Sequence, residues 1–524
     1  DLPGYATRAR NDGSHARLLT TTTDDNLPIP SHNTALQITP KDNQMATIKP
    51  HHPQALPFLF LTEMWERFGF YVVQGLLVLY MTQYFGFSDD DSYAIQGVFT
   101  ALAYISPLAG GYLANKLLGF KTSIVWGGLL LVAGYALLAL PFAKILLYPA
   151  LATIIVGNGL FKPNVSSLLG MQYSKDDPRR DAGFTIFYIG INIGAFLAGL
   201  SSGYIKNYFG WQMSFGLASI GLIIGLLTFA YGRKYIKEAQ VAPITTAAFK
   251  SKLFLYCLLA IVGINFLLRI HALASWLLPC VGIGLLGYLF LLTWQQNPEY
   301  KRKMLILNTL IISSIIFWAL FLQLFLSANL FIDRLVDKTL FGLPLTTTVF
   351  YASESIFIIL LGPLFAWTWH SLGDNDRNPP PISKFVLGIF FTGLGFLVLG
   401  FSTFFPDSNQ LINPFWIFAA YLLITIGELL ISPIGLAAVT ILAPPQLVGL
   451  LMGVWFVATG FGGIFAGWIA KLSSVPDTVQ TVGEKLAIYQ TAFFDYAYLA
   501  FFVAILLFFV QLGLKKMLYS SEDR

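Results

Sequence analysis

The chain has 524 residues, of which 56% are hydrophobic and only 11% are charged, and its mean hydropathy is +0.67. This composition excludes an ordinary soluble domain and indicates a membrane protein with many spans. The net charge of +5 needs no anionic partner, because helical membrane proteins gather Lys and Arg in their cytoplasmic loops. We therefore expect no nucleic acid binding.

Residues 1–54 form a polar segment that contains no apolar run able to serve as the core of a signal peptide. We expect this segment to be disordered. Met45 opens the sequence MATIKPHHPQALPFLF just before the first apolar run. We therefore hypothesise that the native protein starts at Met45 and that residues 1–44 are not native.

Fourteen segments approach the length of about 20 apolar residues that a helix needs to cross the hydrocarbon core. They fall near 57–85, 93–115, 121–143, 146–170, 183–206, 211–233, then 253–270 and 274–296, then 304–332, 346–370, 383–405, 413–442, 447–472 and 490–516. We therefore predict an all-α membrane protein with fourteen transmembrane helices. Its parts are a six-helix bundle over 55–236, two inserted helices over 250–297, a second six-helix bundle over 303–518 and a short tail over 519–524.

Basic residues in the loops indicate the orientation, because Lys and Arg near span ends stay in the cytoplasm. Those on the side of the N-terminus include Lys116, Lys121, Lys175, Arg179, Arg180, Arg233, Lys234 and the run 301–303. The first loop on the other side is the acidic SDDD at 88–91. We expect both termini in the cytoplasm.

Internal repetition supports two related halves. The fourth segment contains GNGLFKPNVSSLLG and the tenth contains GELLISPIGLAAVT, and both place Gly and Pro six residues apart, at Gly157 and Pro163 and at Gly427 and Pro433. A Pro-containing loop follows each of the two segments. This pattern favours two parallel six-helix repeats, a transporter architecture with the substrate site between the halves.

Charged residues inside the predicted spans are the main functional signal, because a charge at the bilayer centre costs about 2.5 to 3.5 kcal/mol. They are Glu63, Glu66, Arg67, Lys162, Glu354 and Glu428. We expect them to face the protein interior.

The first span carries three of these charges in FLTEMWERFGFYVVQGLLVLYM. Glu63 and Arg67 are separated by four residues on a helix and therefore share one face, which Tyr71 and Gln74 continue. One interpretation is a structural salt bridge to a neighbouring helix. The other is a proton site, because two carboxylates beside one guanidinium leave a surplus carboxylate that can hold a proton.

Lys162 and Glu428 lie at nearly corresponding places in the two repeats and have opposite charges. A cavity between the halves would then suit a zwitterion, with its carboxylate toward Lys162 and its ammonium toward Glu428. The alternative is that the two residues pair with each other or with local partners.

The remaining candidates are weaker. Glu354 is interpreted as mostly structural, near the extracellular end of its span. Asp333 and Arg334 are interpreted as residues at the end of a span that could also form an extracellular gate. His370 lies at a cytoplasmic span end, so we expect no histidine proton relay in the core.

Other chemistries find little support in the sequence. There is no P-loop motif and no cluster of metal ligands, and DKTLFG at 337–342 lacks the residues that complete a phosphorylated-aspartate motif. Cys257 and Cys280 both fall in apolar segments, which argues against a disulfide scaffold. We expect neither an enzyme nor a bound cofactor or metal.

Four motifs resemble the proton-dependent oligopeptide transporters, the POT or PTR family. They are EMWERFGFY at 63–71, GNGLFKPNVSSLL at 157–169, FYIGINIGAF at 187–196 and GELLISPIG at 427–435. The resemblance covers residues 57 to about 518 and is strongest to bacterial dipeptide and tripeptide permeases. It implies a major facilitator fold and proton-driven uptake of dipeptides and tripeptides. We expect the protein to lie in a bacterial inner membrane and to function as a monomer.

The resemblance also implies roles for individual residues. Glu63, Glu66 and Arg67 are similar to the family's proton-coupling cluster, Lys162 to the lysine that links it to the peptide carboxylate, and Glu428 to the glutamate that binds the peptide amine. The residues similar to the rest of the family's binding pocket are Tyr71, Gln74, Tyr104, Tyr188, Asn192, Trp318, Gln323, Ser432 and Trp455.

Three positions depart from the family pattern. Gln74 replaces an arginine found in many members, so the peptide carboxylate would rest mainly on Lys162. Leu322 replaces an acid, which removes one candidate proton site, and Asn115 replaces an aspartate of a cytoplasmic charge network. Coupling would then depend on the cluster of the first span.

Two alternatives stay open. A carrier on the same fold could transport another anion, such as nitrate, or a peptide-like drug, although Glu428 argues against a simple anion. A channel or a substrate-sensing membrane protein is the alternative of a different class.

Overall fold

The computed structural model describes residues 51–141, 143–174, 177, 179–238, 247–375 and 377–519. The expected disorder of the N-terminal segment and the proposed start at Met45 concern residues that lie outside this range, apart from residues 51–54. Most of the expected C-terminal tail lies outside it as well.

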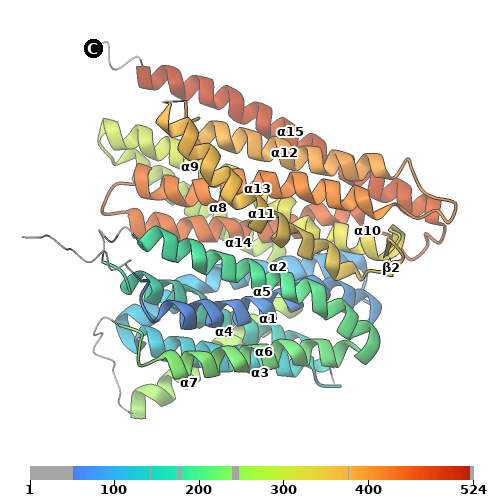
Figure 1. The fold of residues 1–524 in the computed structure, drawn as a ribbon, viewed down its shortest axis with the longest axis horizontal. Coiled ribbons are helices and arrows are strands. Elements are labelled where there is room, and N and C mark those ends of the chain that lie inside the picture. The colour runs from blue at the N-terminus through green and yellow to red at the C-terminus, as the bar shows by residue number, and fades with distance from the viewer. Residues whose placement is uncertain are drawn as a thin grey trace, which may run out of the picture. The chain divides into compact units, whose positions relative to one another are not determined.

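The described chain is almost entirely helical, and its helices alternate in direction along one axis (Figure 1). The first bundle contains α1 Leu56–Gln83, α2 Asp89–Leu113, α3 Phe120–Leu138, α4 Ala143–Met171, α5 Arg180–Phe209 and α6 Trp211–Gly232. The inserted pair is α7 Ala247–Arg269 and α8 His271–Trp294. The second bundle contains α9 Pro298–Phe321, α10 Ser327–Leu335, α11 Thr347–Asp374, α12 Pro381–Ser402, α13 Pro414–Leu442, α14 Val448–Ala470 and α15 Val482–Tyr519.

Thirteen spans among the described residues are long and apolar enough to cross a membrane, with Pro298–Leu335 counted as one span. Helix α1 does not meet that criterion because of its polar and charged residues. Its 28 residues are nevertheless long enough, since a helix rises about 1.5 Å per residue. The expected plan of six, two and six helices is therefore confirmed, with α1 as the fourteenth span.

The helices begin at places that the sequence marks. Ser88 precedes α2, and its hydroxyl accepts a hydrogen bond of 3.1 Å from the backbone N–H of Asp91. Asn297 precedes α9 and accepts in the same way from Tyr300 at 2.9 Å, and Pro298 follows it at the first helical position. These side chains satisfy backbone donors that the first turn leaves free.

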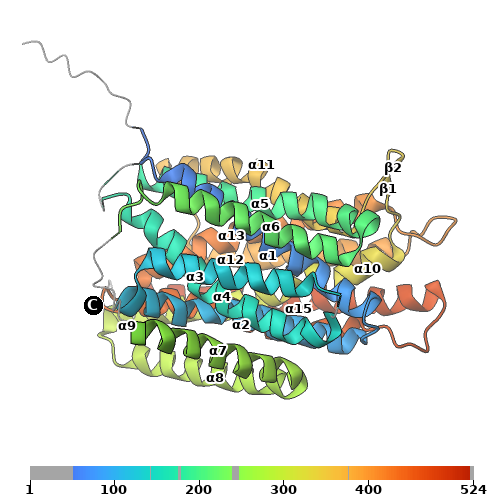
Figure 2. The same cartoon turned by 90° about the horizontal axis from the view of Figure 1, so that it is seen from below.

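The two bundles meet along two helix pairs, because α2 packs on α14 and α5 packs on α11. The inserted helices α7 and α8 lie together at one edge of the bundles (Figure 2). Helix α7 contacts α4, and α8 contacts α2 and α9. The inserted pair therefore touches both bundles without entering the space between them.

One expected span is not a single helix. Helix α9 ends at Phe321, a tight turn follows over Leu322–Phe325, and α10 begins at Ser327. The side chain of Gln323 stabilises this break, because it accepts from the Ser327 hydroxyl at 2.7 Å and donates to the carbonyl of Ala466 at 2.9 Å. The span expected near 304–332 is therefore present, but it contains a break that the sequence analysis did not predict.

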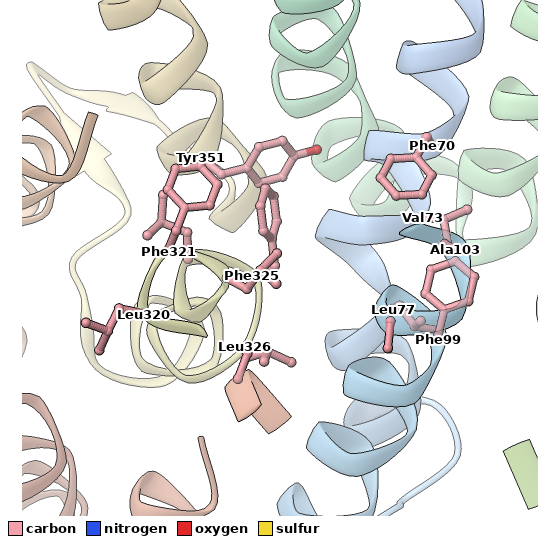
Figure 3. Close-up of a cluster of buried hydrophobic side chains, with 14 of the residues drawn as sticks. Phe70, Val73, Leu77, Phe99, Ala103, Leu320, Phe321, Phe325, Leu326 and Tyr351 are labelled. Atoms are coloured by element: carbon pink, nitrogen blue, oxygen red, sulfur yellow. The ribbon is translucent and has the colours of Figure 1, made fainter. Parts of the chain in front are cut away.

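Apolar side chains from the two halves approach each other beside this break (Figure 3). The rings of Phe325 and Tyr351 lie 5.3 Å apart, and the ring of Tyr71 lies 6.1 Å from that of Phe325. The Tyr351 hydroxyl donates to the backbone carbonyl of Tyr71 at 3.2 Å. These contacts join Tyr71 of α1, Phe325 of the turn after α9 and Tyr351 of α11.

Glycine allows α2 and α4 to pack backbone against backbone. A Cβ added at Gly110 would lie 1.9 Å from the backbone oxygen of Gly159. Small residues at such crossings are what lets membrane helices approach closely. The helix of Lys162 is therefore held directly against α2.

We expect Gly110→Ala to lower the thermal stability of the purified protein, because the nearest atoms belong to a backbone that has little room to move. Overpacking of this kind typically costs about 1 to 3 kcal/mol. The control is Gly284→Ala in α8, where an added Cβ meets no described atom within 4 Å. Equal melting temperatures for the two variants in detergent would contradict this reading of the crossing.

Candidate functional site

The charged cluster of α1 is buried. Arg67 donates to both carboxylate oxygens of Glu66, with Nη2 2.7 Å from Oε1, and its Nε lies 3.5 Å from Oε1 of Glu63. The three residues are 0% to 3% exposed. The expected shared face is therefore present, and the guanidinium is held mainly by one of the two carboxylates.

Glu63 is the less engaged carboxylate. No group in the described part of the chain donates a hydrogen bond to its Oε2. A buried carboxylate oxygen without a donor is costly when it is ionised and much less so when it carries a proton. Glu63 is thus the surplus carboxyl that the sequence led us to expect in this cluster.

Asn158 connects the cluster to the helix of Lys162, and the sequence analysis missed it. Its Oδ1 accepts from Nη2 of Arg67 at 3.2 Å, and its Nδ2 donates to the carbonyl of Ala103 at 2.6 Å. Asn158 lies four residues before Lys162 on α4 and therefore on the same face. That spacing, in a span with few polar residues, was the signal that could have identified it.

Lys162 completes the charge balance of this half. It acts electrostatically on Glu63 and Glu66 and also on Arg67. Two carboxylates and two cations therefore form one electrostatic cluster, and their formal charges cancel when all four are ionised. The Lys162 ammonium lies 4.3 Å from the ring centre of Tyr104 on α2, a cation–π contact.

Lys162 and Tyr104 line a cavity of about 820 Å³ between the halves. Residues of α2, α4, α5 and α14 form its wall, including Arg180 at the start of α5 and Phe456 of α14. The wall contains two cations and, within the described range, no Asp or Glu. The cavity reaches the end of the helices where α4 ends and α5 begins.

Three tyrosines lie within electrostatic range of Glu354 and Glu428, the buried acids of the second half. Tyr71, Tyr104 and Tyr188 each interact electrostatically with both Glu354 and Glu428. Tyr188 is 39% exposed although protein surrounds it, so its ring borders an interior space rather than the outer surface. Phenol groups in such a position can donate hydrogen bonds to a ligand and accept hydrogen bonds from it, if the ligand extends from the charged cluster of α1 to Glu354 and Glu428.

Glu354 lies against Glu428, which the sequence analysis did not foresee. Both are buried, and Glu354 on α11 and Glu428 on α13 are close enough for their carboxyl groups to act on each other electrostatically. The Ser355 hydroxyl donates to Oε2 of Glu354 at 3.1 Å. The sequence analysis interpreted Glu354 as mostly structural, near the extracellular end of its span; whether it has a role beyond that stays a prediction.

Several of the other predicted binding residues already bond to neighbouring protein groups. Gln74 donates to the Thr100 hydroxyl at 3.2 Å, Asn192 to the carbonyl of Tyr188 at 3.0 Å, and Gln323 serves the break after α9. Trp455 is buried, and its ring packs on Gly435.

Trp318 and Ser432 differ from these residues because both are partly exposed. The indole Nε1 of Trp318 has no acceptor within the described residues. The amides of Gln74 and Gln323, by contrast, already bond to protein. The ligand-binding roles of all these residues stay predictions.

The opposite end of the helices is closed by polar contacts between the halves. Arg334 of α10 makes two hydrogen bonds of 2.7 Å with the carboxylate of Asp89 at the start of α2. Asp333 accepts from Gln83 of α1 at 2.6 Å. These contacts fit the gate that the sequence offered as one reading of Asp333 and Arg334. Together with the open cavity at the other end, they describe a carrier that is open on one side.

A cavity between two six-helix bundles, closed at one end and bordered by buried charges, defines a membrane transporter of the major facilitator type. The sequence matches the PTR2 (POT) family over residues 121–488. It is 34% identical over 488 residues to dipeptide and tripeptide permease A of Proteus mirabilis (strain HI4320), with 91% of this chain and 99% of the relative covered. The Yersinia pestis protein of the same name is 35% identical over 480 residues, with 90% and 94% covered.

Solved structures agree with this assignment. A crystal structure of peptide transporter POT in complex with sulfate is 31% identical, has a TM-score of 0.77 and covers 88% of this chain and 95% of its own. A structure of tetrameric PepTSo2 is 28% identical, has a TM-score of 0.79 and covers 88% and 99%. This chain belongs to the POT family. It is a multi-pass membrane transporter, and the expectation that it is not an enzyme is confirmed.

Proposed function

We propose that the chain is a proton-coupled symporter that imports dipeptides and tripeptides across a bacterial inner membrane by alternating access. The observation that carries this proposal is the path from Glu63 and Arg67 through Asn158 to the helix of Lys162, which borders the cavity. In this proposal the path links a proton-binding group, Glu63, to an anion-binding group, Lys162. The names of the relatives, dipeptide and tripeptide permease, support the choice of substrate.

The coupling of proton binding to peptide binding follows from the charge balance of Glu63, Glu66, Arg67 and Lys162. When the peptide carboxylate approaches Lys162, it adds one negative charge to a region whose charges already cancel, and a proton on Glu63 restores the balance. Glu66 meanwhile keeps Arg67 paired. A ligand drives the closing of the halves only if it binds the closed form better than the open ones. Opening to the other side lets the peptide leave Lys162, which removes its negative charge from the region, and the proton on Glu63 then leaves as well.

The zwitterion gives the substrate class. The carboxylate lies toward Lys162, the ammonium lies toward Glu428, and the tyrosines between them contact the peptide backbone. Every dipeptide shares these groups, so we infer a broad tolerance for side chains. A simple anion such as nitrate would leave Glu428 without a counter-charge.

The proposal also covers the orientation of the carrier, its energy source and its oligomeric state. The basic loops support a cytoplasmic location of both termini. In that orientation the cavity opens inward and the contact of Asp89 with Arg334 closes the outside. The proton gradient supplies the energy, without a cofactor or a metal. The carrier works as a monomer in the lipid bilayer, with its two bundles over 55–236 and 303–518 and its inserted helices over 250–297.

The test is uptake of labelled dialanine into proteoliposomes, with and without an inward proton gradient and a negative interior potential. We expect gradient-dependent accumulation that excess unlabelled tripeptide reduces. Uptake that only equilibrates would contradict proton coupling. Absence of saturable uptake and exchange would instead favour another substrate, a channel or a sensor.

A further inference from the structure

An apolar groove lies where α7 packs beside α2 and α4. It has a volume of about 370 Å³, and all three helices line it, with residues from Leu102 to Leu113 on α2, from Ile155 to Leu160 on α4 and from Leu253 to Ile264 on α7. Helix α7 lies with α8 at the edge of the bundles (Figure 2). The groove is separate from the cavity that Lys162 borders, since no described residue lines both.

The chemistry of the groove suits hydrocarbon. Its wall contains no charged side chain among the described residues, and the hydroxyl of Ser106 already donates to the carbonyl of Ile155 at 2.9 Å. Only 11% of the span Lys252–Arg269 is buried in protein, so most of α7 faces the hydrocarbon of the bilayer. A groove beside such a helix fills with lipid chains, because apolar surface avoids water.

The length of the groove matches one leaflet of the bilayer. Its wall on α2 extends from Leu102 to Leu113, which is about 16 Å at about 1.5 Å per residue. The hydrocarbon core is about 30 Å thick, so this length is about half of it. A further helix would be about 10 to 12 Å wide, and such a segment needs far more space than the groove offers. The groove therefore fits a thin, flexible chain.

Two lysines lie at the end of the groove where α2 ends and α7 begins. Lys116 follows the groove residue Leu113 by three positions, and Lys252 directly precedes the groove residue Leu253. Both lysines are exposed, and no described side chain forms an ion pair with either. Tyr256 lines the groove four residues after Lys252, so the two share a face of α7. An exposed tyrosine near a span end is typical of the membrane interface.

We propose that this groove binds one anionic phospholipid, with an acyl chain between α2, α4 and α7 and with Lys116 and Lys252 holding the head group. Two lysines attract a head group of net negative charge more strongly than a zwitterionic one. The phenol of Tyr256 donates to the lipid where the head group meets the chain. The inserted helices thereby acquire a role, because α7 supplies one wall of the site. The proposal is independent of the transported substrate.

The bound chain covers the crossing of α2 and α4. Gly110 of α2 and Gly159 of α4 both line the groove at the point where the two backbones meet. Tyr104 and Lys162, from the same two helices, border the transport cavity instead. The lipid therefore supports the crossing that positions Lys162, and we expect it to raise the melting temperature of the protein.

The first experiment measures lipid binding by native mass spectrometry of the purified protein in detergent. The probes are phosphatidylglycerol and phosphatidylcholine with identical palmitoyl and oleoyl chains, so that they differ in the head group alone. We expect one phosphatidylglycerol to bind roughly thirtyfold more tightly than phosphatidylcholine, which is the preference that two lysines near a membrane surface confer. Equal affinities for the two lipids would overturn the proposal.

The second experiment removes the two charges. The double variant Lys116→Gln and Lys252→Gln should lose the preference for phosphatidylglycerol, and the lipid should no longer raise its melting temperature. The matched control is the double variant Lys234→Gln and Lys301→Gln. It removes two cations from the same side of the membrane, and neither of them adjoins a groove residue in the sequence. An equal loss of preference in both double variants would show a general charge effect and contradict the site.

The third experiment fills the groove. Ala260 of α7 lines it and is exposed, so Ala260→Trp should exclude the acyl chain and weaken phosphatidylglycerol binding by tenfold or more without lowering the melting temperature in lipid-free detergent. The matched control is Gly263→Trp, also on α7, where an added Cβ meets no described atom within 4 Å. Unchanged binding in Ala260→Trp would refute the chain site. A stable dimer of the unaltered protein that binds neither lipid would show that a second copy covers the groove, and it would also refute the proposal.

Discussion

Glu63→Gln is expected to abolish the accumulation of dialanine against its gradient while preserving the exchange of internal for external peptide. Glutamine resembles the protonated form of Glu63, the carboxyl whose Oε2 lacks a donor among the described groups. The variant would therefore bind peptide and change sides as if it were always protonated. Because no proton enters or leaves at this position, the gradient has no means of driving the cycle.

The measurement is the ratio of internal to external labelled dialanine in proteoliposomes, with a proton gradient and a negative interior potential. The ratio should fall to about one in the variant, because an uncoupled carrier only equilibrates its substrate. Counterflow into liposomes loaded with peptide should continue, and its rate should lose the pH dependence that Glu63 confers. A Glu63→Gln protein that still concentrates dialanine would refute this assignment of the proton site.

The matched control is Glu299→Gln. Glu299 also pairs with a base four residues along its helix, since Nζ of Lys303 lies 2.6 Å from its Oε1, but this pair is exposed. Loss of that ion pair should leave accumulation unchanged, because exposed pairs contribute little. A similar defect in both variants would indicate a general loss of folded protein.

The fold could be predicted from sequence to the extent that it depends on length and composition. Spans of about 20 apolar residues, separated by polar loops, have few alternatives in a bilayer. The break after Phe321 could not be predicted, because the apolar run continues through it without Gly or Pro. It exists because Gln323 bonds to Ala466, which lies 143 residues away in the sequence, and contacts of that kind leave no local pattern.

The site divides in the same way. Glu63, Glu66 and Arg67 were identifiable because their contacts lie within one helical turn. The link through Asn158 and the pairing of Glu354 with Glu428 join different helices. Glu354 lies close to the start of its span in the sequence, which suggested a position near the membrane surface. Its actual partner depends on how α11 packs against α13, which only the folded chain determines.

Lys162→Gln is expected to weaken dialanine binding by about a hundredfold, since a charge-assisted hydrogen bond to a carboxylate contributes about 1.5 to 3 kcal/mol and 1.4 kcal/mol is tenfold. A second effect follows from charge balance. Without the Lys162 ammonium, Glu63 and Glu66 face Arg67 alone, so one of them retains a proton through the cycle. Accumulation should therefore fail even at saturating peptide.

Alanylalanine amide separates the two effects, because it retains the ammonium and has no carboxylate. Its affinity should be nearly the same in the unaltered protein and in Lys162→Gln, whereas that of dialanine should differ. The control is Lys384→Gln in α12. Lys384 is a buried lysine, whereas Lys162 is partly exposed, and the ammonium of Lys384 lies 4.0 Å from the ring centre of Trp369, much as Lys162 lies over Tyr104.

Lys384 is not part of the cavity wall formed by the described residues. Its loss should therefore reduce stability without changing the preference for dialanine over the amide. If Lys162→Gln weakens both ligands equally, the lysine supports the fold of α4 and does not bind the carboxylate. If it weakens neither, the carboxylate binds elsewhere in the cavity, and Arg180, the other cation of its wall, becomes the position to substitute.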